Sequence, residues 1–137
     1  MTKRNSFHES LRVGHHQIDS QHEELFSLFD DIENATRDGA DLPVLDSTIN
    51  DLIDYTDTHF TFEKELMLTA DFPNLKQHIC EHKKMMAQAI GYLIRYKSKR
   101  ESSREIAIDI HDFIKSWFTN HIAAEDKGLS HYLNNKS

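Results

Sequence analysis

His59 and Glu63 stand four residues apart in the segment His59-Phe60-Thr61-Phe62-Glu63. The apolar residues around them, from Leu45 to Leu66, recur every three or four positions, which is the period of a helix with one buried face. His59 and Glu63 fall on that face, so the pattern places a carboxylate in the core. An ionised carboxylate taken out of water costs several kcal/mol unless a cation and hydrogen bonds meet it. The segment therefore indicates a buried cation beside Glu63.

Six residues that can bind metals share the predicted inward faces of four helices: His22, His59, Glu63, His78, His82 and His121. A single histidine on an apolar face is more often a hydrogen-bonded structural residue than a ligand. Five imidazoles and a carboxylate in one narrow core would leave many polar atoms without partners, which native proteins avoid. A metal supplies those partners, and i,i+4 spacing lets His78 and His82 reach one centre. The pattern therefore predicts a metal site inside the bundle.

The other histidines lie off these faces and are expected at the surface: His8, His15, His16, His111 and His131. Cys80 lies two residues from His78 and from His82, so it points to another side of its helix and is not expected to be a ligand.

The expected helices cover about residues 19–38, 42–69, 74–97 and 102–127. Asp19 or Ser20 is expected to cap the first helix, Ser102 to cap the last, and Gly128 to follow its end. Four helices with short connections predict an all-α, antiparallel up-down-up-down four-helix bundle. Residues 1–18 show no sustained helical period and are expected to form an N-terminal arm that packs on the bundle.

The composition favours one helical domain, because 137 residues fit a single core and four Gly and two Pro are few for an all-β chain. A net charge of -7, from 16 basic and 23 acidic residues, argues against a nucleic-acid or anionic-membrane partner. The single Cys80 cannot form an internal disulfide, and neither a membrane span nor a signal-peptide core is apparent. We expect a cytoplasmic monomer.

The residues around the histidines resemble those of the hemerythrin family and its single-domain bacterial members. The resemblance covers about residues 12–133. Its motifs are Ile18-Asp19-Ser20-Gln21-His22, His59-Phe60-Thr61-Phe62-Glu63, His78 with Glu81-His82, and Trp117-Phe118-Thr119-Asn120-His121-Ile122 followed by Asp126. Lys64 departs from the family pattern, since a second acid commonly follows the bridging Glu.

The resemblance implies a non-haem di-iron centre, with two iron ions bridged by carboxylates and an oxo or hydroxo group. The implied terminal ligands are His22, His59, His78, His82 and His121, and the implied bridges are Glu63 and Asp126. The resemblance assigns His78, His82 and His121 to one iron. It assigns His22 and His59 to the other, which is expected to have the open position.

The spacing of the second bridge conflicts with a regular helix. Asp126 is five residues after His121, which turns its carboxylate about 140° away, whereas Glu125 has the better i,i+4 spacing. Periodicity alone favours Glu125 and the resemblance favours Asp126. A π-bulge or a loosened last turn would reconcile the two, since such bulges often accompany functional sites. We expect Asp126 to be the bridge.

The ligand set favours reversible O2 binding for storage, delivery or buffering. Carboxylate-rich di-iron sites have about four carboxylates and two histidines, whereas this set has two carboxylates and five neutral imidazoles. With fewer carboxylates, the ligands donate less negative charge to the metals, which disfavours cleavage of the O–O bond of bound O2. Two alternatives remain open: a module that senses O2, redox state or iron, and a di-iron enzyme for peroxide or nitric oxide detoxification or iron-centre repair.

The resemblance also implies an apolar O2 pocket formed by Leu25, Phe60, Trp117, Phe118 and Ile122. Azide or other small anions are expected at the same open position. Trp117 lies on the predicted inward stripe of its helix, and Phe118 lies one step off it. The larger ring of Phe118, where the family more often carries Leu, is expected to narrow the entrance.

Overall fold

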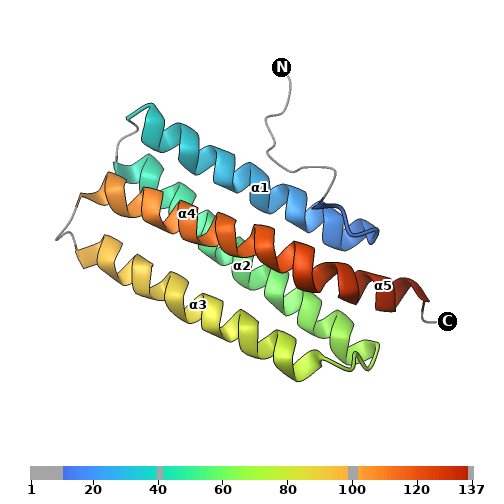
Figure 1. Cartoon of the computed structure of the whole chain (residues 1–137). Helices are drawn as coiled ribbons and strands as arrows, with labels where there is room; N and C mark the ends of the chain where they lie inside the picture. Colours follow the sequence, from blue (N-terminus) through green and yellow to red (C-terminus); the bar gives the residue numbers. More distant parts are fainter. Residues whose placement is uncertain (1–10, 40–41, 99–101, 136–137) are drawn as a thin grey trace, which may run out of the picture.

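A computed structural model of the protein describes residues 11–39, 42–98 and 102–135. They form α1 (His16–Arg37), α2 (Leu42–Thr69), α3 (Leu75–Ser98), α4 (Ser103–His121), the π-helical turn η2 (Ile122–Asp126) and α5 (Lys127–Asn135). The four long helices, α1 to α4, lie side by side (Figure 1), and the described residues contain no strand. The predicted all-α class is confirmed. Among the described residues, no helix is both long enough and apolar enough to cross a membrane.

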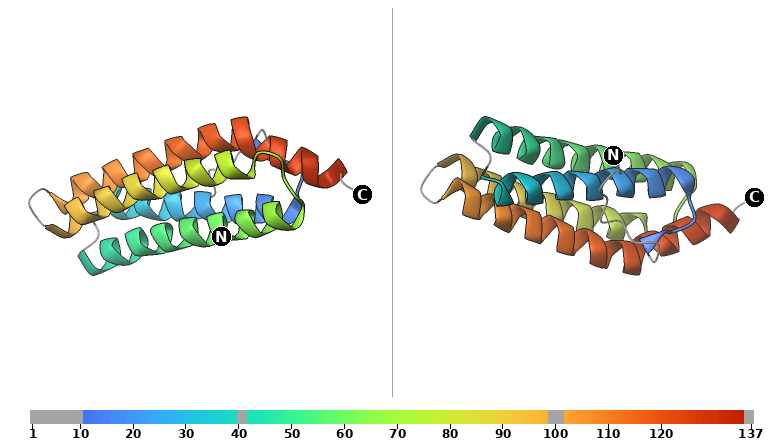
Figure 2. Two further views of the ribbon diagram at one scale, coloured as in Figure 1. Left: turned by 90° about the horizontal axis from the view of Figure 1, so that it is seen from below. Right: turned by 90° about the horizontal axis from the view of Figure 1, so that it is seen from above.

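The long helices run alternately in opposite directions. α1 packs against α2 and α4, and α3 packs against the same two helices. Figure 2 shows the end of α1, the start of α2, the end of α3 and the start of α4 at one end of the molecule, and the α2–α3 link at the other end. This arrangement is the predicted antiparallel four-helix bundle. α2 spans the predicted residues, and α3 begins and ends one residue later than predicted.

Two apolar clusters form the core, and the polar residues of interest lie between them. Along α1, His22 lies between Ile18, in a small cluster with Met67, and Leu25, in the large cluster that fills most of the bundle. Along α2, Glu63 lies between Phe60 of the large cluster and Met67 of the small one. Full burial of each such side chain contributes about 1.5–3 kcal/mol, so apolar packing on both sides holds the polar layer in place.

α1 begins at His16, earlier than the predicted residue 19. Its N-cap is His15, whose Nδ1 accepts a hydrogen bond from the backbone N–H of Ile18 at 3.3 Å. The last residues of the expected N-terminal arm are therefore helical. Residues 1–10 of that arm lie outside the described part of the chain.

Asp19 does not cap α1, and neither does Ser20, so that prediction is wrong. The Asp19 carboxylate accepts hydrogen bonds from the backbone N–H groups of Val13 and Gly14, at 2.8 and 3.1 Å. Gly14 has a φ of 88°, which lets the chain turn tightly just before the helix. Asp19 thus stabilises the turn that precedes α1 instead of the first turn of the helix.

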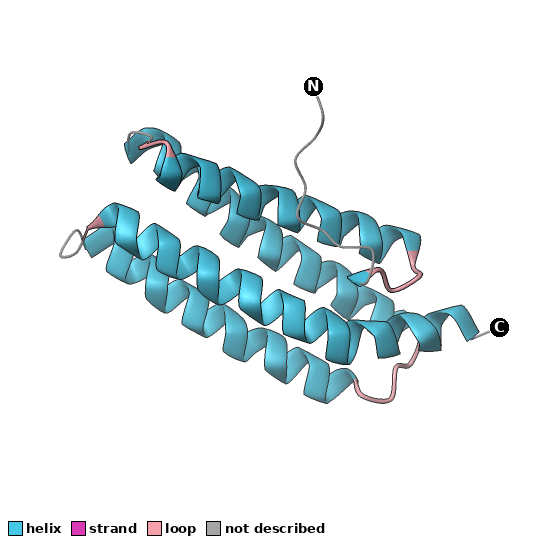
Figure 3. Ribbon diagram, turned by 45° about the horizontal axis from the view of Figure 1, so that its top comes forward, coloured by secondary structure: helices cyan, strands magenta, loops and turns pink. Residues whose placement is uncertain are grey.

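The predicted end of the last helix near Gly128 is wrong, because the helical chain continues through η2 and α5. Leu129 is fully buried, and Ser130 Oγ donates a hydrogen bond to the carbonyl of Val13 at 2.7 Å. Figure 3 shows α5 between the loop that precedes α1 and the loop that precedes α3. The extension is stabilised by contacts with distant segments, which the local sequence does not reveal.

The buried side of α4 differs from the predicted stripe. Phe118 is fully buried, whereas Trp117 is only half-buried. His111, predicted at the surface, is 8% exposed, and its Nε2 lies 3.2 Å from a carboxylate oxygen of Glu33 on α1. The difference arises because α4 also packs against α1, which buries a second face of the helix. His16 and His131 are exposed as predicted, and His8 lies outside the described residues.

Candidate metal centre

Seven polar residues meet in the layer between the two apolar clusters, with exposed fractions of 0 to 5%. They are His22 of α1, His59 and Glu63 of α2, His78 and His82 of α3, His121 of α4 and Asp126 of η2. The structure thus brings together all seven residues that the resemblance implies as ligands. The i,i+4 spacing on α2 and on α3 places two side chains from each helix on its inward face.

The imidazole nitrogens form two groups. Nε2 of His121 lies 3.1 Å from Nε2 of His78 and 3.3 Å from Nε2 of His82. Nε2 of His22 lies 3.2 Å from Nε2 of His59. Two ligand atoms at about 2.1 Å from one ion, and at a right angle, are about 3.0 Å apart. Each group therefore has the spacing of side chains that share a metal ion.

Glu63 lies between the two groups. Its Oε2 is 3.2 Å from Nε2 of His59, and its Oε1 is 3.5 Å from Nε2 of His78 and 3.4 Å from Nε2 of His82. One carboxylate oxygen thus faces each group. This is the arrangement required of a carboxylate that bridges two cations.

Asp126 lies between the same groups in the same way. Its Oδ2 is 3.0 Å from Nε2 of His22, whereas its Oδ1 is 3.1 Å from Nε2 of His121 and 3.2 Å from Nε2 of His78. Two carboxylates of this kind, with five imidazoles, can hold a pair of cations side by side.

The π-helical turn η2 places Asp126 in the cluster. The backbone N–H of Lys127 donates to the carbonyl of Ile122, an i→i+5 hydrogen bond that widens the helix. Widening the turn brings a residue five positions after His121 back to the inward face. Asp126 is fully buried, whereas Glu125 is partly exposed. The π-turn thus places Asp126, and not Glu125, among the site histidines.

The donor set fits metal cations. All four carboxylate oxygens of Glu63 and Asp126 are buried without a hydrogen-bond partner among the described residues. Buried carboxylates without hydrogen bonds are costly unless a cation compensates them. Imidazole and carboxylate together suit iron, zinc and similar ions. Two overlapping sets of ligand atoms are within reach of a common ion: Glu63, His78, His82 and His121, and His22, His59, Glu63 and Asp126.

Without a cation, His78 and His59 compensate the carboxylates by holding protons. Burial lowers the pKa of His78, but the nearby carboxylates of Asp126 and Glu63 outweigh burial and raise the pKa to about 10. Burial also lowers the pKa of His59, and the charge of Glu63 reverses the shift, so that this pKa is raised. Burial raises the pKa values of Glu63 and Asp126, but the surrounding imidazoles lower both below their usual range. Metal binding must therefore displace protons from His78 and His59.

Two residues outside the predicted site contact the outer nitrogens of its imidazoles. Gln21 Oε1 accepts a hydrogen bond from Nδ1 of His59 at 2.7 Å, and a Glu81 carboxylate oxygen lies 3.6 Å from Nδ1 of His121. Such contacts fix the tautomer and the ring orientation of a ligand. Each joins two helices, so periodicity could not identify it. The only local sign is that each residue directly precedes a site histidine.

The five residues of the predicted O2 pocket lie in the large apolar cluster or pack against it: Leu25, Phe60, Trp117, Phe118 and Ile122. The ring centroid of Phe60 is 5.5 Å from that of Trp117 and 5.6 Å from that of Phe118. The Phe118 ring is 5.7 Å from His59 and 6.5 Å from His22. An aromatic wall thus covers the group formed by His22 and His59.

Fold and site together define a four-helix-bundle protein with an interior site for cations. The sequence model of the hemerythrin HHE cation binding domain matches residues 13–133. The chain belongs to the hemerythrin family.

Several curated proteins are similar over most of their length. A bacteriohemerythrin of Stenotrophomonas maltophilia is 25% identical over 122 residues, which are 89% of this chain and 76% of the relative. A bacteriohemerythrin of Pseudomonas aeruginosa is 27% identical over 88% of this chain and 75% of its own length. A hemerythrin-like protein of Naegleria gruberi is 30% identical over 85% of this chain and 83% of its own.

Proposed function

We propose that this protein binds O2 reversibly at a di-iron centre, for storage, delivery or buffering of oxygen. The observation that carries the proposal is the placement of Glu63 and Asp126, each with one oxygen beside each imidazole group. That placement supports two cations held close together. Membership of the hemerythrin family supports iron as the metal.

The charges of the ligands support reversible O2 binding over an enzymatic reaction that consumes O2. Two carboxylates and five imidazoles donate less negative charge than the carboxylate-rich di-iron sites of helical bundles. When bound, two ferrous ions would supply electrons and a coordination position for O2. His22 and His59 supply two imidazoles to their group and the other group has three, so the open position falls on the His22 and His59 side.

The surrounding residues act by excluding water and by orienting ligands. Phe60, Phe118 and Ile122 are buried and apolar, so water and hydrated ions meet a desolvation cost at the site. Gln21 holds the His59 ring with Nε2 directed at the cluster. Together these features favour the binding and release of a small uncharged ligand.

The test begins with anaerobic loading of the protein with ferrous iron and an iron assay. We expect two irons per chain, a new visible absorption band on exposure to O2, and loss of the band under vacuum with O2 recovered intact. A zinc-loaded sample is the matched control, because it fills the site without redox chemistry. One iron per chain would contradict the dinuclear site. Consumption of O2 to water on every cycle would favour the enzymatic alternative.

A further inference from the structure

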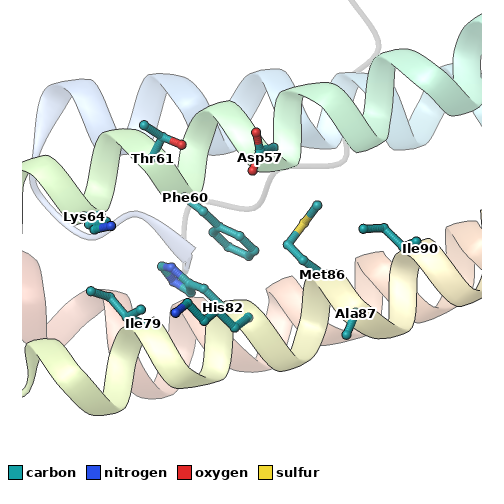
Figure 4. A pocket seen from close by; sticks show the side chains of 10 residues that line it. Asp57, Phe60, Thr61, Lys64, Ile79, His82, Met86, Ala87 and Ile90 are labelled. Atoms are coloured by element: carbon teal, nitrogen blue, oxygen red, sulfur yellow. The ribbon is translucent and has the colours of Figure 1, made fainter.

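A groove of about 440 Å³ lies between α2 and α3, directly over one side of the candidate metal centre. Figure 4 shows Phe60 and His82 pointing toward each other across the space between the two helices. Phe60, Ile79, Met86 and Ile90 give the groove an apolar lining. Of the seven site residues, His82 is the one that lines it, so the groove reaches the cluster.

Phe60 separates the groove from the interior. Its ring stacks on the His82 imidazole, with centroids 3.8 Å apart and an interplanar angle of 10°. On its inner side the same ring contacts Trp117 and Phe118, and the Phe118 ring is 5.7 Å from His59. A small ligand that passes Phe60 therefore arrives at the aromatic wall beside His59.

The groove carries two cationic side chains, Lys64 from α2 and Lys83 from α3. Both are exposed, and neither is ion-paired with another residue that the structure describes. Asp57 also lines the groove, and Figure 4 shows it further along α2, toward Ile90 and away from Lys64. The formal charge of the whole protein is -7, so anions are repelled from most of the surface. The two lysines beside Phe60 make this groove a place where anions are attracted instead.

We propose that this groove is the entrance through which small monovalent anions reach the metal centre, and that Lys64 and Lys83 draw them to Phe60. The inference rests on the proposed di-iron site. The apolar lining requires an anion to lose water as it enters, which favours weakly hydrated ions such as azide over strongly hydrated ones such as fluoride. The groove thus selects for charge and for ease of dehydration.

The test is the rate of azide association with the oxidised, iron-loaded protein, followed by stopped-flow absorption at low ionic strength. Lys64→Gln and Lys83→Gln should each slow association about two- to threefold, and the double variant about five- to tenfold. These differences should largely disappear at about 0.5 M salt, because screening removes the attraction. Asp57→Asn should have the opposite effect and speed association.

Lys97→Gln is the matched control, because Lys97 is an exposed lysine in the last turn of α3, about 20 Å along the helix from Lys83, and does not line this groove. We expect it to leave the azide rate unchanged. Association of uncharged O2 with the reduced protein should not respond to the two groove lysines. Phe60→Leu should speed the association of azide and of O2 alike, because it thins the barrier without changing the charge.

The outcomes separate this inference from the proposed function. Equal rates of azide association in wild type and in the double lysine variant would overturn the proposal that this groove is the anion entrance. Equal slowing by Lys97→Gln, or unchanged rates in Phe60→Leu, would overturn it as well. If the protein takes up two irons and the double lysine variant binds azide as fast as wild type, the proposed entrance is wrong but the di-iron proposal stands. Failure to hold two irons would overturn the proposed function itself.

Discussion

Gln21 and His59 are hydrogen-bonded to each other across two neighbouring helices: Oε1 of Gln21 lies 2.7 Å from Nδ1 of His59. The amide oxygen can only accept, so Nδ1 carries the proton. Nε2 of the same ring is then the nitrogen that faces Glu63 and the rest of the cluster, where it can exchange its proton for a metal ion. The orientation of this ligand thus depends on a residue outside the ligand set.

Gln21→Leu should lower the affinity for metal at the His22 and His59 group about tenfold, because the His59 ring loses the acceptor that orients it. Competition with a chelator, followed by absorption, measures the effect. Gln17→Leu is the control, since Gln17 is an exposed residue on the same helix. Equal affinities in the two variants would show that the hydrogen bond does not support the site.

Asp126→Asn should reduce bound iron from two ions per chain to one or fewer, because an amide cannot replace the bridging negative charge. Glu125→Gln should keep both ions, since Glu125 is partly exposed and outside the cluster. An iron assay after loading and desalting compares the pair. The reverse result would mean that the spacing of a regular helix, and not the π-turn, describes the site in solution.

Removal of the metal should lower the thermal unfolding temperature, because Glu63 and Asp126 would remain buried without a cation. At a free metal concentration of about 100 times Kd, binding adds about 2.7 kcal/mol to the free energy of unfolding. His82→Ala should lose at least one ion and part of that stabilisation. Calorimetry of the loaded and metal-free proteins tests this, and equal unfolding temperatures would contradict it.

The metal-free protein should be most stable between about pH 4.5 and pH 6.5. The pKa of His78 is raised from 6.5 to about 10, so its contribution to stability is complete below 6.5 and is lost as the pH rises through 10. The pKa values of Glu63 and Asp126 are lowered from 4.5 and 3.8, so their contribution is present above these values and is lost as the pH falls through the folded-state values.

Denaturant unfolding at a series of pH values measures this profile. His78→Gln should reduce the loss of unfolding free energy at alkaline pH, while the dependence on pH at acid pH stays the same. Metal affinity should change in the opposite direction and rise with pH over the alkaline window, because the imidazoles lose the protons that compete with the metal. A metal-free protein whose stability rises from pH 7 to pH 10 would contradict the prediction.

Phe118→Ala should speed autoxidation and azide binding several-fold while both irons stay bound, because it opens the aromatic wall beside His59. Phe118 is fully buried, so the truncation also costs about 3–5 kcal/mol of stability. Phe118→Leu should show a smaller effect in the same direction with less destabilisation. Phe26→Leu is the control, since its ring packs on Phe29 in the same core. Unchanged rates at full iron occupancy would make Phe118 an ordinary core residue.

The inward positions of the site histidines follow from the sequence, because helical periodicity is a property of each segment alone. His22, His59, Glu63, His78 and His82 all lie where the spacing of apolar residues predicts. The bundle itself also follows, since four amphipathic segments with short links have few other ways to bury their apolar faces. The burial of Phe118 and His111 does not follow from the sequence, because it depends on how closely α4 packs against α1.

The tertiary structure decides the contacts that join helices. Local spacing favours Glu125 over Asp126, and only the π-turn before α5, packed against the chain ahead of α1, turns Asp126 inward. Gln21 reaches His59, and Glu63 faces both imidazole groups, only because α1, α2 and α3 settle in one particular register. A periodic pattern specifies which face of a helix is buried. The axial offset between neighbouring helices arises from side-chain packing across the whole core, which no single segment contains.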